Sequence, residues 1–139
     1  MTGTETKSRS EIQAILSSVG IKCEWVAMDE FYILPSKKEL QELLTVTFFE
    51  KYKYNIKKFD CNSFALMLTA FVTQQRYFKN DEYRWCLGMV CGYFPKFSPD
   101  YHGRNLAILD DGKVYLIEPQ QDTIEEKDDK DNICFINYL

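Results

Sequence analysis

The chain has 139 residues, a length that suits one domain over residues 1–139, and 45% of them are hydrophobic, enough to build a core without disulfides. A net charge of −4 and a pI of about 5.1 argue against a nucleic-acid-binding protein, because such proteins are more often basic. No apolar run reaches the length of a membrane span, and the polar start lacks the apolar stretch of a signal peptide.

The five cysteines are odd in number and show no CxxC spacing. Extracellular domains of this size more often carry an even disulfide framework. We therefore expect free thiols and a soluble, cytoplasmic protein from a reducing compartment, with no nucleic-acid or membrane partner. The oligomeric state is left open.

Two short helices are predicted in the first third of the chain. Ser10 is a cap-type residue before a helical pattern that Gly20 ends. Ser36 is followed three positions later by Glu39, which is the spacing of a capping box. The remaining segments before residue 60 are expected to be non-helical: disordered over 1–8, extended over 22–26 and 31–34, and irregular over 48–59.

A longer helix is predicted to begin after Asp60 and to run to about Gln75. Its apolar residues recur at helical spacing: Phe64, Leu68, Phe71 and Val72. Because Asp60 is a good N-cap residue, Cys61 would be the first residue of the helix. Helix N-termini carry a partial positive charge and unpaired N–H groups, and both favour a thiolate.

The second half of the chain predicts an antiparallel sheet. Strands are expected over 85–94, 102–109, 114–118 and 133–139, with charged loops over 79–84 and 122–132. Helices that come first and strands that come after are typical of the α+β class.

Two registers are possible for the hairpin around residues 110–112. Side chains alternate across a strand, so a two-residue turn would place His102 and Glu118 on opposite faces of the sheet. A three-residue loop with Gly112 in the left-handed conformation would place them on one face, diagonally adjacent, with Gln120 opposite His102. A catalytic role for this histidine and carboxylate requires the three-residue loop.

Cys61 and His102, the only histidine of the chain, are the candidate reactive pair. A thiolate is the nucleophilic form of cysteine, and a neighbouring imidazole is the usual means of generating it near neutral pH. Glu118 would accept a hydrogen bond from the other ring nitrogen, with Gln120 as the competing residue. The alternatives are a cysteine that is only buried, a histidine without a task, and a Glu118 that is solvated or paired with Arg104.

Three motifs together resemble the papain-like superfamily of cysteine proteases. They are Asp-Cys-Asn-Ser-Phe-Ala at 60–65, His102 with Asn105, and Ile-Glu-Pro-Gln at 117–120. The pattern covers residues 55–121 and is most similar to the C-terminal protease domain of the Marasmius oreades agglutinin, a mushroom lectin. No part of the chain is similar to the lectin domain of that protein.

This resemblance implies a papain-like α+β fold in which the central helix starts at the cysteine and packs on a small antiparallel sheet. It also implies a peptidase or amidase that cleaves a peptide or protein substrate through a Cys61–His102–Glu118 triad and a thioester intermediate. No cofactor is required by this chemistry, and no metal site is expected. Calcium dependence is implied by the resemblance alone.

Further residues are candidates for the surroundings of this site. The backbone N–H of Cys61 could stabilise an oxyanion, and Asn55 or Gln120 could supply a second donor or orient the histidine. The walls of the substrate cleft would come from three aromatic residues: Trp85, Tyr93 and Tyr101. Asn105 would face away from His102 and have a structural role.

Two other functions remain open. One is a non-catalytic papain-like module that binds a partner, and the other is a transglutaminase-like acyl transferase with the same triad. Because a fold does not determine a function, the position of Cys61 relative to the imidazole is the first feature to establish.

Overall fold

The computed structural model describes residues 5–27, 29–47, 49–57, 59–79, 81–137 and 139. They form two sheets, one with the strand order β1-β2-β3 and the other with the order β7-β6-β5-β4-β8. The elements in chain order are β1 (Glu5–Ser8), α1 (Arg9–Ser18), β2 (Phe31–Leu34), α2 (Lys37–Leu44), a short 3-10 helix (Phe49–Lys51), α3 (Cys61–Phe78), β3 (Arg84–Trp85), β4 (Leu87–Phe94), β5 (Ser98–Ile108), β6 (Val114–Glu118), β7 (Thr123–Glu126) and β8 (Asn132–Asn137).

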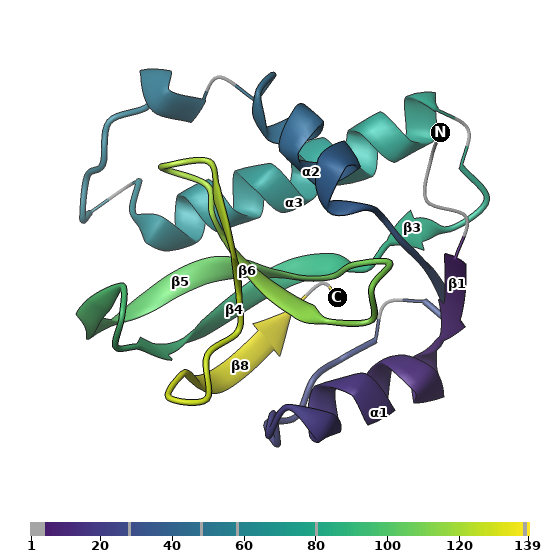
Figure 1. The fold of residues 1–139 in the computed structure, drawn as a ribbon. Helices are drawn as coiled ribbons and strands as arrows, with labels where there is room; N and C mark the ends of the chain where they lie inside the picture. The colour runs from purple at the N-terminus through teal and green to yellow at the C-terminus, as the bar shows by residue number, and fades with distance from the viewer. Residues whose placement is uncertain (1–4, 28, 48, 58, 80, 138) are drawn as a thin grey trace.

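The five-stranded sheet carries helices on both faces (Figure 1). Helices α2 and α3 lie on one face, and α1 lies on the other. Alternate residues of β5 therefore enter different cores: Leu106 packs with α1, whereas Ala107 packs under α2 and α3. Strand β6 is buried along its whole length because both of its faces are covered.

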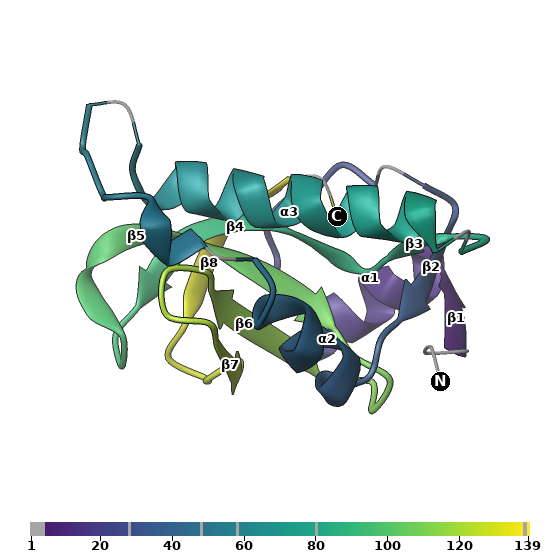
Figure 2. The same ribbon diagram turned by 90° about the horizontal axis from the view of Figure 1, so that it is seen from above.

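Helix α3 begins at Cys61 because Asp60 caps it. The carboxylate of Asp60 accepts hydrogen bonds from the backbone N–H groups of Asn62 and Ser63. The buried stripe of the helix follows a four-residue spacing and consists of Phe64, Leu68 and Val72, with Ala65 and Thr69 beside it. The predicted start is confirmed, and Figure 2 shows the helix running along the sheet beside α2. It ends at Phe78 rather than near Gln75.

The hairpin between β5 and β6 has the three-residue loop. The N–H of Leu109 donates to the carbonyl of Lys113 at 3.2 Å, and Gly112 has a φ of +76°. Asn105 pairs with Ile117 in the resulting register. This register, which the catalytic interpretation required, places the side chains of His102 and Glu118 on the same face of the sheet.

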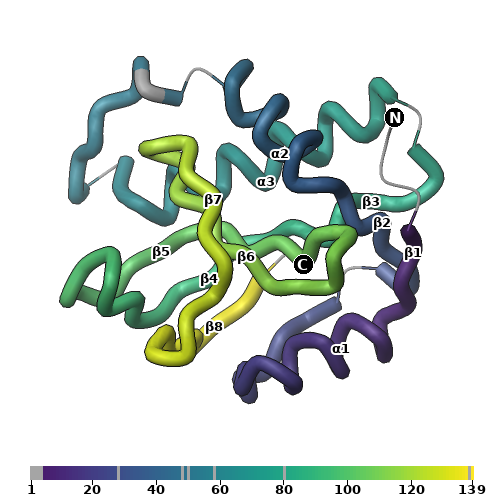
Figure 3. Tube along the Cα trace, viewed as in Figure 1, coloured from purple at the N-terminus to yellow at the C-terminus, as the bar shows by residue number. Residues whose placement is uncertain are grey.

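Disorder was expected over residues 1–8, of which residues 1–4 lie outside the described residues and residues 5–8 are ordered. Residues 5–8 form β1, which pairs antiparallel with β2, and β2 pairs parallel with β3. Figure 3 shows these three distant segments side by side. Ser8, not Ser10, is the N-cap of α1, with a capping box to Glu11.

The predicted fold class is corrected on this point. The chain was expected to place helices first and one small antiparallel sheet after. Its described residues instead form two sheets with eight strands, and one of these sheets contains a parallel pair. The difference arises from pairing between segments far apart in sequence, which local patterns do not reveal.

None of the helices in the described part of the chain is long and apolar enough to cross a membrane. All five cysteines lie in the described part, and all are free thiols, as the sequence predicted.

Candidate functional site

Cys61 and His102 meet at the N-terminal end of α3. Cys61 is half-buried, and its Sγ accepts a hydrogen bond from the backbone N–H of Gly103 at 3.3 Å. The side chain of His102 forms a hydrogen bond with the same sulfur. Because Nε2 of the ring is bound to a carboxylate, Nδ1 is the nitrogen that faces the sulfur. The chain therefore brings together the two residues that the sequence paired.

That carboxylate is Glu118. His102 Nε2 lies 2.7 Å from Oε1 of Glu118, whose side chain is only 1% exposed. The imidazole ring also packs against Phe97, with ring centroids 4.8 Å apart. A short hydrogen bond and a packed ring fix the orientation of the imidazole between sulfur and carboxylate.

The electrostatics of the three groups favour an ion pair. The hydrogen bond to His102 lowers the pKa of Cys61, and this effect together with the Gly103 N–H outweighs burial, which raises it. Burial lowers the pKa of His102, but the hydrogen bonds to Cys61 and Glu118 outweigh it and raise the pKa to about 9. At neutral pH, histidine is therefore the charged partner of a thiol whose pKa is depressed.

A close approach of backbone to helix makes this geometry possible. A Cβ on Gly103 would lie only 2.2 Å from Oδ1 of Asn62, so a glycine allows strand β5 to reach the first turn of α3. Asn62 Oδ1 also accepts a hydrogen bond from Sγ of Cys91 at 3.3 Å. Helix α3 and strands β5 and β4 are thus joined beside the sulfur of Cys61.

Arg104 lies behind Glu118 and is 1% exposed. Its guanidinium lies over the rings of Phe94 and Phe97, at 5.3 and 4.7 Å from their centroids, and Nη2 is 4.0 Å from Oε2 of Glu125. In the sequence analysis, Arg104 was only an alternative partner for Glu118. No local sequence signal predicted its burial or its aromatic contacts, because Phe94, Phe97 and Glu125 come from three other segments.

The proposed cleft residues divide into two groups. Tyr93 and Tyr101 are 45% and 52% exposed and pack edge to face, with centroids 5.3 Å apart. They lie on the same face of the sheet as Cys91, whose thiol contacts the first turn of α3. Trp85, the third candidate, is 2% exposed and belongs to the core under α2 and α3, so its assignment to this cleft is corrected.

The two proposed amide groups do not complete the site as expected. Asn55 is exposed, and its Oδ1 accepts a hydrogen bond from the N–H of Lys57 within its own turn. Gln120 is half-buried in the turn after β6, while Glu118 rather than Gln120 binds the imidazole. Asn105 has the structural role predicted for it, since its Nδ2 donates to acceptors in α3 and β4.

The described residues contain no group of three or more His, Cys, Asp or Glu side chains that could hold a metal ion. Calcium dependence, which the resemblance alone implied, stays an expectation.

No family model matches the sequence, and no curated protein matches it. Among the solved structures that share the fold are the following two. One is the PSL1a-E64 complex, with a TM-score of 0.82, 15% identity and coverage of 96% of this chain and 51% of the other. The second is Polyporus squamosus lectin bound to the human-type influenza-binding epitope Neu5Aca2-6Galb1-4GlcNAc, with a TM-score of 0.79, 15% identity and coverage of 96% and 49%.

The chain shares its fold with part of a lectin. It spans about half the length of each of these two structures. The second neighbour carries the name of a lectin, and neither is named as a papain-like protease. This finding contradicts the predicted papain-like fold and the resemblance on which it rested.

The functional interpretation changes with it. The comparison opposes the predicted cysteine peptidase or amidase with a peptide substrate. The hydrogen bonds among Cys61, His102 and Glu118 are a property of the site, and they do not by themselves establish turnover.

Proposed function

We propose that this chain is a non-catalytic module that binds a glycan. The observation that carries the proposal is the exposed Tyr93–Tyr101 pair beside the first turn of α3, on a fold shared with part of a lectin. Tyrosine presents a rigid apolar ring and a polar hydroxyl, which suits the mixed faces of a sugar.

The surface around the pair supports a hydroxyl-rich ligand. We name Tyr93, Tyr101, Phe135 and Asn62 the aromatic platform. Phe135 is 50% exposed and lies opposite Cys91 in the ladder between β4 and β8, so it shares the face of the two tyrosines. Asn62 is exposed, and its amide NH₂ adds hydrogen-bond donors next to the rings.

In this proposal, Cys61, His102 and Glu118 position the platform. The Gly103 N–H and the imidazole bind the sulfur at the first helical residue, immediately before Asn62. These contacts hold the end of α3 against β5, from which Tyr101 projects. The free cysteines agree with a reducing compartment, and we place the protein in the cytoplasm.

The test is binding to an immobilised oligosaccharide array that includes Neu5Aca2-6Galb1-4GlcNAc. We expect Tyr101→Ala and Tyr93→Ala each to weaken binding at least about tenfold, because aromatic anchors dominate such contacts. Tyr77→Ala is the matched control, since Tyr77 is 80% exposed on the last turn of α3.

Two results would contradict the proposal. One is the absence of binding to every glycan on the array. The other is turnover: the bound glycan recovered in a cleaved form, or a denatured protein cut by the wild type and left intact by Cys61→Ala. Mass spectrometry of the incubated ligand and protein distinguishes these results from simple binding.

A further inference from the structure

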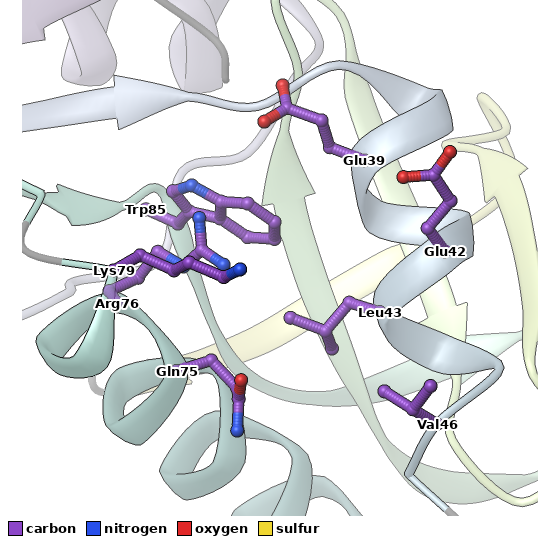
Figure 4. A pocket seen from close by; sticks show the side chains of 8 residues that line it. All are labelled: Glu39, Glu42, Leu43, Val46, Gln75, Arg76, Lys79 and Trp85. Carbon is purple, nitrogen blue, oxygen red and sulfur yellow. The ribbon is translucent and has the colours of Figure 1, made fainter. Parts of the chain in front are cut away.

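A pocket lies between α2 and the C-terminal part of α3, away from the aromatic platform. It has a volume of about 370 Å³, within the range of small-molecule sites. Its lining residues are Glu39, Glu42, Leu43, Val46, Gln75, Arg76, Lys79 and Trp85 (Figure 4). Because Cys61 begins α3 and Lys79 follows its last residue, the pocket and the aromatic platform lie at opposite ends of the helix.

The two walls of this pocket carry opposite charges. Helix α2 contributes the carboxylates of Glu39 and Glu42, and the end of α3 contributes the cationic groups of Arg76 and Lys79. Among the described residues, the ion pairs include none that joins these walls. The carboxylates of Glu39 and Glu42 and the ammonium of Lys79 therefore face a space that these side chains do not close, and the guanidinium of Arg76 faces it while paired with Asp81 on its other side.

Arg76 is held in place from two sides. Its Nη1 lies 3.1 Å from Oδ2 of Asp81, and its guanidinium stacks on the ring of Trp85, 4.0 Å from the centroid. Trp85 is itself 2% exposed, so the indole ring under the guanidinium is rigid. A preorganised cation loses little freedom when it binds an anionic group.

The opposite wall is less constrained and partly apolar. One oxygen of Glu39 accepts a hydrogen bond from the N–H of Ser36, while Glu42 is exposed on the next turn of α2. Leu43 and Val46 add an apolar surface beside these carboxylates. A ligand with a short apolar side chain would cover that surface and exclude water from it.

We propose that this pocket binds a small zwitterion of the amino-acid type. Its carboxylate lies against Arg76 and Lys79, its ammonium lies against Glu42 and Glu39, and its side chain covers Leu43 and Val46. A simple anion would be repelled by two carboxylates, and a simple cation would be repelled by a guanidinium and an ammonium. For each of them, repulsion from one wall would offset the electrostatic attraction of the other. This pocket is separate from the aromatic platform, and the proposal for it does not depend on glycan binding there.

The fluorescence of Trp85 is a direct probe of binding. The chain has two tryptophans, so Trp25→Phe leaves Trp85 as the only one. We expect L-leucine to change its emission saturably, with half-saturation below about 10 mM. N-acetyl-L-leucine lacks the positive charge and L-leucinamide lacks the negative one, and each is expected to bind at least about fivefold more weakly. Calorimetry on the wild type repeats the comparison without the substitution.

Substitutions then test the two walls. Lys79→Met and Glu42→Gln are each expected to weaken L-leucine binding about three- to tenfold, whereas Lys38→Met, which lies on α2 outside the pocket, leaves it unchanged. Equal binding of all three leucine derivatives would overturn the proposal, as would the absence of any response on both assays. Neither result bears on glycan binding at the platform.

Discussion

His102 Nε2 lies 2.7 Å from Oε1 of Glu118, on strands whose register depends on a three-residue loop. A loop one residue shorter would send the two side chains to opposite faces of the sheet. Gly112, with its positive φ, therefore determines the contact between an imidazole and a carboxylate that lie far from it along the hairpin.

The titration of His102 reports this contact directly. Because the chain has one histidine, its ring signals are unambiguous in an NMR titration. We expect a midpoint near 9, above the ordinary value of 6.5, and a lower midpoint in Glu118→Gln, which removes the charge but keeps the shape. A midpoint near 6.5 in the wild type would contradict the geometry of the site.

The same shift makes stability depend on pH. The pKa of His102 is higher in the folded than in the unfolded chain, so protonation of the ring stabilises the fold. This contribution is complete below about pH 6.5 and is lost as the pH rises through about 9. Urea unfolding of wild type and His102→Gln should therefore differ most at pH 6 and converge above pH 9, and a constant difference would show that the charge has no role.

Cys61 is expected to be the most reactive of the five thiols. Its pKa is lowered by His102, whereas burial raises the pKa of Cys86 to about 12 and also raises those of Cys23 and Cys91. Iodoacetamide labelling followed by mass spectrometry should modify Cys61 first below pH 8. His102→Ala should remove that advantage. If another cysteine is labelled faster in the wild type, the ion pair does not form.

Two glycines of the sheet should differ in their tolerance of a methyl group. A Cβ on Gly92 would lie 2.2 Å from the backbone carbonyl oxygen of Asn132, which cannot move without breaking the ladder between β4 and β8. A Cβ on Gly103 meets a side-chain atom of Asn62 instead. We expect Gly92→Ala to cost about 2–3 kcal/mol and Gly103→Ala about 1 kcal/mol in urea unfolding.

The double variant Asn62→Gly with Gly103→Ala is the control for this comparison. It removes the atom that the new methyl group would meet, so the local clash should disappear while the loss of the Asn62 side chain remains. Stability of this double variant equal to that of Asn62→Gly alone would locate the clash at Oδ1. A further loss would place it in the backbone.

Asn105 joins α3 to the sheet through its side-chain amide. The two hydrogens of Nδ2 are shared among three acceptors: the carbonyl of Ala65 at 2.9 Å, Oγ1 of Thr69 at 3.1 Å and the carbonyl of Gly88 at 3.2 Å. Asn105→Leu removes these contacts, although the carbonyl of Ala65 keeps its hydrogen bond from the Thr69 hydroxyl, and should cost about 2–4 kcal/mol. Thr69→Val removes one acceptor of the amide together with that hydroxyl donor, leaves the other contacts of Asn105 in place, and should cost less. Equal losses in thermal unfolding would show that packing, not hydrogen bonding, determines the result.

Local signals predicted α3 well. Asp60 and the apolar residues Phe64, Leu68 and Val72 lie within one short segment of the sequence. The first identifies the start of the helix, and the spacing of the others identifies its buried face. The hairpin was narrowed to two registers by the same kind of signal, because side-chain alternation and a glycine at the loop restrict the pairing. The contact of His102 with Glu118 followed once the register was known.

Long-range pairing was not predicted. Residues 5–8 are polar and carry no strand pattern, yet they pair with β2, and β2 in turn pairs in parallel with two residues of β3. Trp85 failed as a cleft residue for a related reason. An aromatic residue next to a charged loop gives no indication that α2 and α3 will cover it.

The sequence by itself determined the start of α3 at Cys61, the buried face of that helix, and the identity of the thiol, imidazole and carboxylate that meet. The helix and the contact of His102 with Glu118 depend on neighbours within a turn or a hairpin, where residue spacing is enough to predict the contact. Cys61 was paired with His102 because His102 is the only histidine of the chain. Only the tertiary structure decided that the chain forms two sheets, that Arg104 is buried behind Glu118, and that oppositely charged walls of α2 and α3 enclose a pocket. Each of these depends on contacts between distant segments, whose free energy is set by packing and not by local pattern.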